Sequence, residues 1–449
     1  HCYIAHARLV ALAHLSAIFS YALALYGTFL ARSGLLGDFS VHSFSGTGVG
    51  LWLVAVDAIV ALAGLSLLVW RAGKFPKGSP YPVHRSREFF LLLGCLALTF
   101  LAIIVFIGMS MPLLTGLGGD SAAVDTGFYV KTSLPLAICM LLAMAVGSLL
   151  HYGEGQASLP KALIGAIFAG AAAAGLAGVR EVSSLVLAGA AAAAVFASVL
   201  AWRGGALRLA AAVAHAGAAL ALFTIALAAA GTSTTLEFVP DEPQSFGRNS
   251  ILYEGMDLSE SRREKEYVFR VDGEEVRALT KLSASGEDAA REPAIAHGAA
   301  GDIYIAPSPA AVGHEIVLQR GKAILEGDVA YRLEHVIEEE PDDEGRRLFL
   351  ADIAVTDGET VDLAEVSLTA AGMKAATESF AVLNGKRRLR LLGISEDKKS
   401  IMLQILPAIE EEARLPLTAS VSNKPLLWLL WLGAAFTFFG TSCALRRRC

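Results

Sequence analysis

Apolar residues fall into eight long runs, and one extended polar stretch interrupts them. The runs lie near residues 9–30, 49–70, 89–113, 132–150, 160–178, 182–202, 207–230 and 425–445. Each run is long enough to cross the hydrocarbon core of a bilayer as an α-helix. The pattern therefore predicts eight transmembrane helices, seven in a block and one near the C-terminal end of the chain.

The polar stretch, residues 231–424, follows a different period. Segments such as Tyr267–Val271 and Leu348–Val355 alternate apolar with polar residues, which is typical of strands with one buried face. Turn-forming pairs separate such segments, namely Asp272-Gly273, Asp357-Gly358 and Asn384-Gly385. We expect an antiparallel β domain, a sandwich or a barrel. The predicted fold class is therefore a membrane all-α bundle of about eight transmembrane helices with an inserted β-rich domain.

The distribution of lysine and arginine predicts the orientation of the helices. The connections at 71–88 and 203–208 are basic, and the chain ends in a basic tail at 446–448. Connections on the opposite side contain few basic residues, namely Arg32, Lys131 and Arg180. Because basic loops stay in the cytoplasm, we expect a multi-pass protein of the bacterial inner membrane with residues 231–424 in the periplasm.

Three domains are expected from these patterns. They are a seven-helix membrane block at 1–230, a periplasmic β-rich domain at 231–424, and a last helix with a basic cytoplasmic tail at 425–449. A composition of 54% hydrophobic and 18% charged residues, with a mean hydropathy of +0.53, excludes a soluble protein of this size. The chain begins with histidine rather than methionine, so we expect a fragment or a processed half of a longer protein.

Candidate chemistry begins where the first helix leaves the membrane. After the breaks at Gly34 and Gly37, His42 lies between Phe39 and Phe44. An imidazole between aromatic rings suits haem, since neutral histidine is a common axial ligand of haem iron. On residue type alone, a hydrated interfacial histidine is the simpler interpretation. Arg32, at the neck of this loop, is either a partner for a haem propionate or a positional anchor.

His215 is the second candidate ligand. It lies eight positions after Leu207, so about 12 Å into its predicted helix. An ionisable residue at that depth is costly and indicates function, although a hydrogen bond to a neighbouring helix is the structural alternative. We expect Gly217 beside it to let a flat ring system approach the backbone. The alanine-rich helices at 160–230 are interpreted mainly as tightly packed.

Several short motifs occur in one order along the chain and together resemble the cytochrome c biogenesis protein family CcmF, the membrane haem-lyase component that attaches haem to apocytochrome c. The motifs are Gly27-Thr28-Phe29-Leu30, Arg32-Ser33-Gly34, Val41-His42-x-Phe44, Ser86-Arg87-Glu88, His215-Ala216-Gly217, Glu292-Pro293-Ala294-Ile295, Asp302-Ile303-Tyr304, Lys424-Pro425 and Trp431-Leu432-Gly433. The resemblance covers nearly the whole chain, but only the C-terminal part of the family's length.

The resemblance implies two haem sites. It implies that His215 ligates an embedded b-type haem (haem b), with His1 as the other ligand. His14 is the physical rival of His1, because its depth in its own helix is closer to that of His215. The resemblance also implies that His42 ligates the haem that is presented at the periplasmic face. No Cys-x-x-Cys-His motif occurs, so we expect no covalent haem on this chain.

The resemblance also implies the partners. They are an N-terminal CcmF-like half with a tryptophan-rich segment, a haem chaperone, apocytochrome c with its thiol-reducing partner, and quinol as the source of electrons. We expect no nucleic acid. Two departures stand out: the tryptophan-rich segment and the first loop histidine are absent, and about 120 residues separate Tyr304 from Lys424 where a short connection is expected. The alternative function is a non-haem membrane transporter subunit with a periplasmic β domain.

Overall fold

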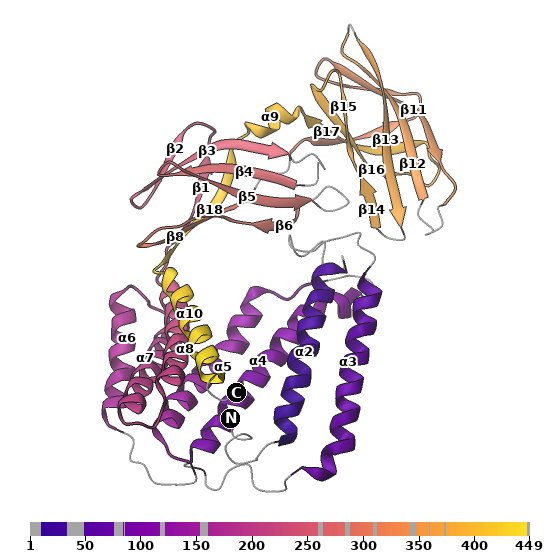
Figure 1. Cartoon of the computed structure of the whole chain (residues 1–449). Coiled ribbons are helices and arrows are strands. Elements are labelled where there is room, and N and C mark those ends of the chain that lie inside the picture. Colours follow the sequence, from indigo (N-terminus) through magenta and orange to yellow (C-terminus); the bar gives the residue numbers. More distant parts are fainter. Residues whose placement is uncertain are drawn as a thin grey trace.

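A computed structural model places a bundle of helices beside two β-sandwiches (Figure 1). The structure describes residues 10–33, 49–75, 84, 86–116, 122–152, 160–258, 264–282, 288–308, 312–341, 347–358, 360–371 and 374–446. We call the end of the bundle that joins the sandwiches the domain side, and the opposite end the far side.

The helices coincide with the eight apolar runs. They are α2 Val10–Arg32, α3 Gly50–Arg71, α4 Arg87–Gly116, α5 Thr126–Leu149, α6 Ala162–Leu176, α7 Val182–Arg203, α8 Leu209–Ala228 and α10 Trp428–Arg446, with a short 3-10 turn, η1 Ala72–Lys74, after α3. Seven of the helices that the structure describes are long and apolar enough to cross a membrane, and α6 has 15 residues. The predicted fold class, a membrane helical bundle with an inserted β-rich domain, is confirmed.

Close packing of small residues joins α8 to α10. A Cβ atom at Gly217 of α8 would lie 2.6 Å from the carbonyl oxygen of Gly433 on α10, so the two backbones touch. Gly440 brings α10 equally close to Ala214. Such contacts replace the hydrophobic drive that lipid does not supply between helices. The interpretation of the alanine- and glycine-rich helices as tightly packed is confirmed.

The hairpin of α2 and α3 makes fewer contacts with the rest of the bundle. Among the described residues of α3, none is buried. Near the domain side, the Tyr26 hydroxyl lies 2.7 Å from Ser110 Oγ on α4, and the Tyr26 and Phe106 rings lie 5.1 Å apart. Towards the far side, an apolar cavity of about 750 Å³ separates α2 from α4, lined from Leu12 to Leu23 on one helix and from Leu91 to Phe106 on the other.

The sandwich next to the bundle, the inner sandwich, combines a sheet ordered β1-β18-β8-β7 with a sheet ordered β2-β3-β4-β5-β6. Its strands are β1 Ser233–Phe238, β2 Pro243–Phe246, β3 Asn249–Leu258, β4 Glu264–Val271, β5 Glu274–Leu282, β6 Asp288–Glu292, β7 Ala294–Ala296, β8 Gly301–Pro307 and β18 Leu417–Pro425. Phe238, Tyr253 and Phe269 lie in its core. Residues far apart in the chain thus share one core.

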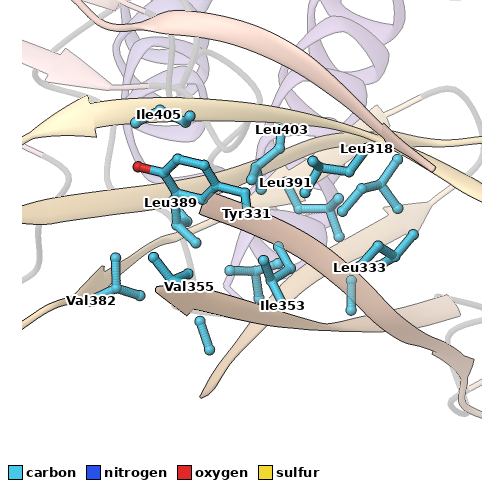
Figure 2. Packing of buried hydrophobic residues seen from close by; sticks show 14 of the residues in the cluster. Leu318, Tyr331, Leu333, Ile353, Val355, Val382, Leu389, Leu391, Leu403 and Ile405 are labelled. Atoms are coloured by element: carbon cyan, nitrogen blue, oxygen red, sulfur yellow. The ribbon is translucent and has the colours of Figure 1, made fainter. Parts of the chain in front are cut away.

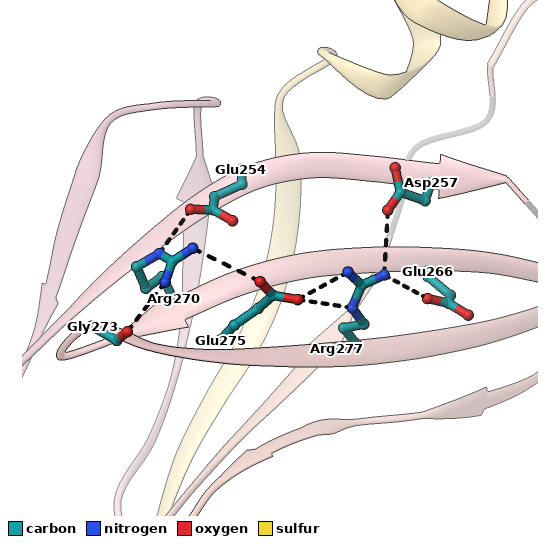
Figure 3. A network of polar contacts seen from close by, with 7 residues as sticks. All are labelled: Glu254, Asp257, Glu266, Arg270, Gly273, Glu275 and Arg277. Atoms are coloured by element: carbon teal, nitrogen blue, oxygen red, sulfur yellow. Dashed lines mark hydrogen bonds and ion pairs between the residues drawn. The ribbon is translucent and has the colours of Figure 1, made fainter.

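Polar side chains cover strands β3, β4 and β5 of the inner sandwich (Figure 3). Arg270 pairs with Glu254 at 2.8 Å, and Arg277 pairs with Glu266 and Glu275 at 2.9 Å each. These side chains are all substantially exposed, so each pair contributes little to stability. The network therefore marks the solvated face of this sheet.

The outer sandwich repeats the same arrangement. Its sheets are ordered β9-β17-β16-β15 and β10-β11-β12-β13-β14. Its strands are β9 His314–Gln319, β10 Ala323–Glu326, β11 Val329–Glu338, β12 Arg347–Thr356, β13 Val361–Ala371, β14 Lys374–Thr377, β15 Ser379–Val382, β16 Arg387–Ile394 and β17 Ser400–Pro407. Tyr331, Leu333, Ile353 and Leu389 are fully buried in its core (Figure 2).

The two sandwiches are related strand by strand. Replacing β1, β18, β8 and β7 by β9, β17, β16 and β15 converts one four-stranded sheet into the other, and the five-stranded sheets match in the same way. The whole outer sandwich lies between β8 and β18 of the inner one. The expected single sandwich or barrel is therefore two sandwiches, one inserted into the other, and this insertion accounts for the extra residues between Tyr304 and Lys424.

A short helix, α9 Ile409–Ala413, joins the two sandwiches on the return path of the chain. Its Glu412 is buried and accepts hydrogen bonds from Arg388 of the outer sandwich and from Lys265 of the inner one, the latter at 2.8 Å. Burial alone would raise the pKa of Glu412, but Lys265 and Arg388 hold it below its usual range. One carboxylate thus connects cations from both sandwiches.

Candidate functional site

His215 lies on α8, six residues after the helix begins at Leu209, which places it about 9 Å from that end. Its Nδ1 atom is 3.3 Å from Ser148 Oγ on α5, and the Ser148 hydroxyl donates to the Met144 carbonyl oxygen at 2.7 Å. Because the hydroxyl proton is used in this way, Nδ1 must be the donor to Ser148. The Nε2 atom then carries the lone pair that a metal requires.

A buried polar cluster lies on the far side of the bundle, next to the turn that leads into the helix of this histidine. Arg87, at the start of α4, donates from Nη1 to the Ala206 carbonyl oxygen at 3.0 Å, and its guanidinium lies 5.1 Å from the centre of the Tyr152 ring. Its backbone nitrogen donates to the His151 carbonyl oxygen at 3.2 Å. The contact with Ala206, in the turn between α7 and α8, fixes a cation three residues before the helix that carries His215.

The sequence motif Ser86-Arg87-Glu88 produces this cluster. Ser86 is fully buried and caps α4, accepting from the Phe89 backbone nitrogen at 3.4 Å, as a serine at a helix start usually does. Glu88 is only 1% exposed. In the sequence, this motif is part of the family resemblance and has no predicted role. Two adjacent charged residues at the start of an apolar helix are the signal that points to a buried site, because buried charges require partners.

Gly217 does not have the role that the sequence analysis expected. We expected an open backbone beside His215 that a flat ring could approach. Instead, the Cβ position of Gly217 is filled by the backbone of Gly433 and Thr437 and by Phe436. The small residue is needed for the crossing of α8 and α10, so this expectation was wrong.

His14 lies in different surroundings from His215. Its Nδ1 atom is 2.8 Å from the Val10 carbonyl oxygen, and its ring stacks on Phe75 with the centroids 5.5 Å apart. α2 packs mainly on α3, whereas α8 packs on α7 and α10. His215 contacts Ser148 of α5, so the two histidines lie on helices with different main packing partners.

The remaining candidates lie near the limits of the described chain. Arg32 is the last residue of α2 and lies on the domain side, where Ser33 faces Gly50 of α3. His42 and His1 lie outside the described residues. Their roles as haem ligands stay predictions, and so does the pairing of Arg32 with a propionate.

A second pair of polar residues lies where the inner sandwich meets the bundle. His297 Nδ1 is 3.1 Å from Asp302 Oδ2, and the Gly298 backbone nitrogen donates to Asp302 Oδ1 at 3.2 Å. The side chain of His297 is 73% exposed, whereas that of Asp302 is 8% exposed. A buried carboxylate thus holds an exposed imidazole.

The same turn holds the start of α10. The Trp428 indole nitrogen donates to the Ala299 carbonyl oxygen at 3.1 Å, and the Leu426 backbone nitrogen donates to the Ala300 carbonyl oxygen at the same distance. In the sheet, Asp302 of β8 is opposite Lys424 of β18. The sequence motifs around Asp302 and Lys424, which are far apart in the chain, therefore form one structural unit.

Within the described part of the chain, no group of three or more His, Cys, Asp or Glu residues is placed to hold a metal ion. A structural zinc ion needs four protein ligands, and a catalytic one needs three. Haem supplies four equatorial nitrogens of its own and asks the protein only for axial ligands. The single imidazoles of His215 and His297 suit axial ligation of haem, which needs only one or two protein ligands.

Comparisons with curated proteins identify relatives. The chain is 33% identical over 145 residues to the cytochrome c-type biogenesis protein CycK of Bradyrhizobium diazoefficiens, which is 32% of this chain and 21% of that protein. It is 34% identical over 142 residues to CcmF of Pseudomonas aeruginosa and 33% identical over 143 residues to CcmF of Escherichia coli. The matched region of this chain spans about a fifth of the length of these relatives. The resemblance to cytochrome c biogenesis proteins is confirmed over about a third of this chain.

Two further comparisons add detail. No protein family profile matches the chain. A solved structure named cytochrome c heme lyase CcmF aligns with 98% of this chain and 55% of its own, at a TM-score of 0.46 and 15% identity.

Proposed function

We propose that the chain is part of a CcmF-type cytochrome c haem lyase and holds haem for covalent attachment to apocytochrome c. The observation that carries the proposal is the identity of about a third over some 145 residues to cytochrome c-type biogenesis proteins. The buried polar cluster near His215 supports it, because an embedded imidazole with a fixed tautomer is otherwise costly in a membrane.

The embedded site is proposed to hold a b-type haem, which supplies electron transfer when bound. His215 would ligate through Nε2, since Ser148 accepts from Nδ1. Arg87 is held in place by Ala206 and Tyr152, and its charge suits a propionate. His1 is the proposed second ligand on the resemblance, and His14 is its rival. Gly217 has no part in this site because α10 fills its open side.

A second haem is proposed at the domain side. His42 would be its ligand on this chain, and Arg32 at the end of α2 would offset propionate charge. The orientation proposed for the chain places the domain side in the periplasm and the far side in the cytoplasm of a bacterial inner membrane. An N-terminal CcmF-like half with the tryptophan-rich segment, a haem chaperone, apocytochrome c with its thiol-reducing partner, and quinol are the proposed partners.

An absorption spectrum of the full chain, purified with its N-terminal partner, tests the proposal. His215→Ala should abolish the low-spin signal of a bis-histidine haem, because one axial ligand is lost. His42→Ala should keep that signal and fail to mature cytochrome c in cells. Added imidazole should partly restore maturation by filling the vacant coordination position. A His215→Ala spectrum identical to wild type, together with full maturation by His42→Ala, would refute the proposed function.

A further inference from the structure

His297 is an exposed histidine whose ring is hydrogen-bonded to a buried carboxylate. Its Nδ1 atom contacts Asp302, whose carboxylate is buried and also accepts from the Gly298 backbone. With Nδ1 engaged and the side chain 73% exposed, Nε2 is the nitrogen open to a ligand. Histidines that bind metals usually donate their other ring N–H to a carboxylate in this way, which fixes the tautomer and strengthens the ligand.

The surroundings of His297 favour a flat apolar ligand. The turn that follows it is bound to Trp428, which is 47% exposed, and Trp431, three residues further along α10, is 70% exposed. Tryptophan at a membrane interface presents an apolar ring to one side and a polar atom to the other. The Trp428 indole N–H is already used on Ala299, so the exposed part of its ring offers apolar surface.

The ligand class follows from the number of donors. A bare metal ion needs several protein ligands, and no cluster of three is found among the described residues. One imidazole is sufficient only for a metal that brings its own equatorial ligands, and an iron porphyrin is such a ligand.

We propose that His297 is an axial ligand for iron porphyrin at the membrane-facing end of the inner sandwich, and that Asp302 is its positioning residue. The choice of iron porphyrin rests on the proposed haem-handling function. This site differs from the two haem sites of that function: His215 lies inside the bundle, and His42 belongs to the connection between α2 and α3.

Haem titration of the purified full chain tests the proposal. The parent chain carries His42→Ala, His215→Ala, His1→Ala and His14→Ala, so that the other proposed ligands and the rival of His1 are removed. Ferric haem is added in detergent, and absorption and electron paramagnetic resonance report the axial ligand. We expect an imidazole-ligated signal that saturates near one haem per chain and is lost on His297→Ala. His314→Ala is the matched control, because His314 is also exposed but its Nε2 atom is 3.2 Å from Glu326 in the outer sandwich.

Two further variants separate ligation from a structural role. His297→Tyr should replace the imidazole signal with that of a phenolate ligand, which only a residue bound to iron can do. Asp302→Asn keeps an acceptor for the Gly298 backbone but removes the carboxylate. It should weaken haem binding by roughly tenfold and shift the midpoint potential of the bound haem to more positive values, because the imidazole becomes a weaker donor.

The outcomes decide the proposal in either direction. Haem binding that is identical in the parent and in His297→Ala, or a His297→Tyr spectrum without a phenolate ligand, would overturn it. The test is independent of the proposed function, which is read from cytochrome c maturation with His42 and His215 intact. A chain could therefore fail in maturation while His297 still binds haem, or mature cytochrome c while His297 does not.

Discussion

Arg87 is a buried cation with a specific set of contacts, and the first prediction concerns its side chain. Arg87→Ala removes the donor to the Ala206 carbonyl oxygen and the group stacked on Tyr152. Hydrogen bonds to charged groups contribute roughly 1.5–3 kcal/mol each, so we expect a lower unfolding temperature in detergent and loss of the proposed embedded haem. Arg87→Lys should restore only part of this, because an ammonium group cannot reproduce the planar guanidinium.

The control for Arg87 is Arg203→Ala. Arg203 is an exposed arginine at the end of α7 on the same side of the bundle. It carries the same charge without the buried contacts, so its removal should leave both the unfolding temperature and the haem signal unchanged. Equal effects of the two substitutions would show that charge on the far side matters and that the contacts of Arg87 do not.

Individual site residues were only partly predictable from the sequence. His215 was recognised because an ionisable residue inside an apolar run is conspicuous. Its partner Ser148 lies 67 positions away, and no local pattern connects the two. His297 and Asp302 are five residues apart, a spacing that has meaning only once the turn between β7 and β8 is formed. Tertiary contacts, and not motif spacing, assemble both sites.

The crossing of α8 and α10 depends on glycine, which gives a prediction at the scale of elements. Gly217→Val adds a side chain where the Gly433 carbonyl oxygen is 2.6 Å from the Cβ position. Overpacking of this kind costs about 1–3 kcal/mol, so the unfolding temperature should fall and α10 should become accessible to protease. Gly165→Val on α6 is the matched control, because nothing lies within 4 Å of its Cβ position. Similar effects at both positions would show that valine destabilises these helices in general, whether or not the position is in close contact with α10.

The helix α9 gives a prediction on pH dependence. Burial alone would raise the pKa of Glu412, but Lys265 and Arg388 lower it below the ordinary value of 4.5. The stability that this carboxylate contributes is therefore complete above pH 4.5 and is lost as the pH falls through the lower pKa of the folded state. Hydrogen exchange of α9 in the full chain should become faster across that acidic range.

Substitutions at α9 test this assignment. Glu412→Gln should make exchange of α9 fast at neutral pH and remove its acidic transition, because the two cations lose their shared carboxylate. Glu411→Gln is the control, since Glu411 is 59% exposed and pairs with Arg387 at 3.5 Å. An acidic transition that persists in Glu412→Gln would assign it to another carboxylate.

Helices were predicted far better than sheets at this scale. A run of apolar residues specifies a membrane helix by itself, because every backbone group is satisfied within the run. Alternation identifies a strand such as β12 but not its neighbours, which are set by pairing across the chain. Gly217 shows the same limit for helices: the sequence indicates a close approach, but whether a ligand or a second helix makes it depends on α10, more than two hundred residues away.

At the scale of the whole molecule, the β domain is large because it contains two sandwiches. The matching strand orders show that the outer sandwich is a second copy of the inner arrangement, placed between β8 and β18. The sequence showed extra residues here and predicted strands within them. The sequence could not show the repeat. Tyr253 and Tyr331 are each buried in the core of their own sandwich, but they do not belong to a sequence motif that recurs in both.

The insertion leaves and re-enters the inner sandwich at neighbouring points, which gives the last prediction. Ile405 of β17 is opposite His314 of β9, and Gln404 Nε2 donates to the Val312 carbonyl oxygen at 3.2 Å. Insertions with adjacent ends are usually removable, because the host fold does not need them to close its own core.

Replacing residues 314–405 by a short Gly-Ser linker should therefore leave the helices inserted and the inner sandwich folded, with normal exchange protection of β3 and β4. Removing the inner sheet at 240–292 is the control and should abolish folding of the inner sandwich, because Phe238 and Leu417 lose the sheet that covers them. If the first deletion also unfolds the inner sandwich, the outer sandwich is an integral part of one core. If it folds and still matures cytochrome c, the second copy is an accessory to the proposed haem chemistry, which then belongs to the bundle and the inner sandwich.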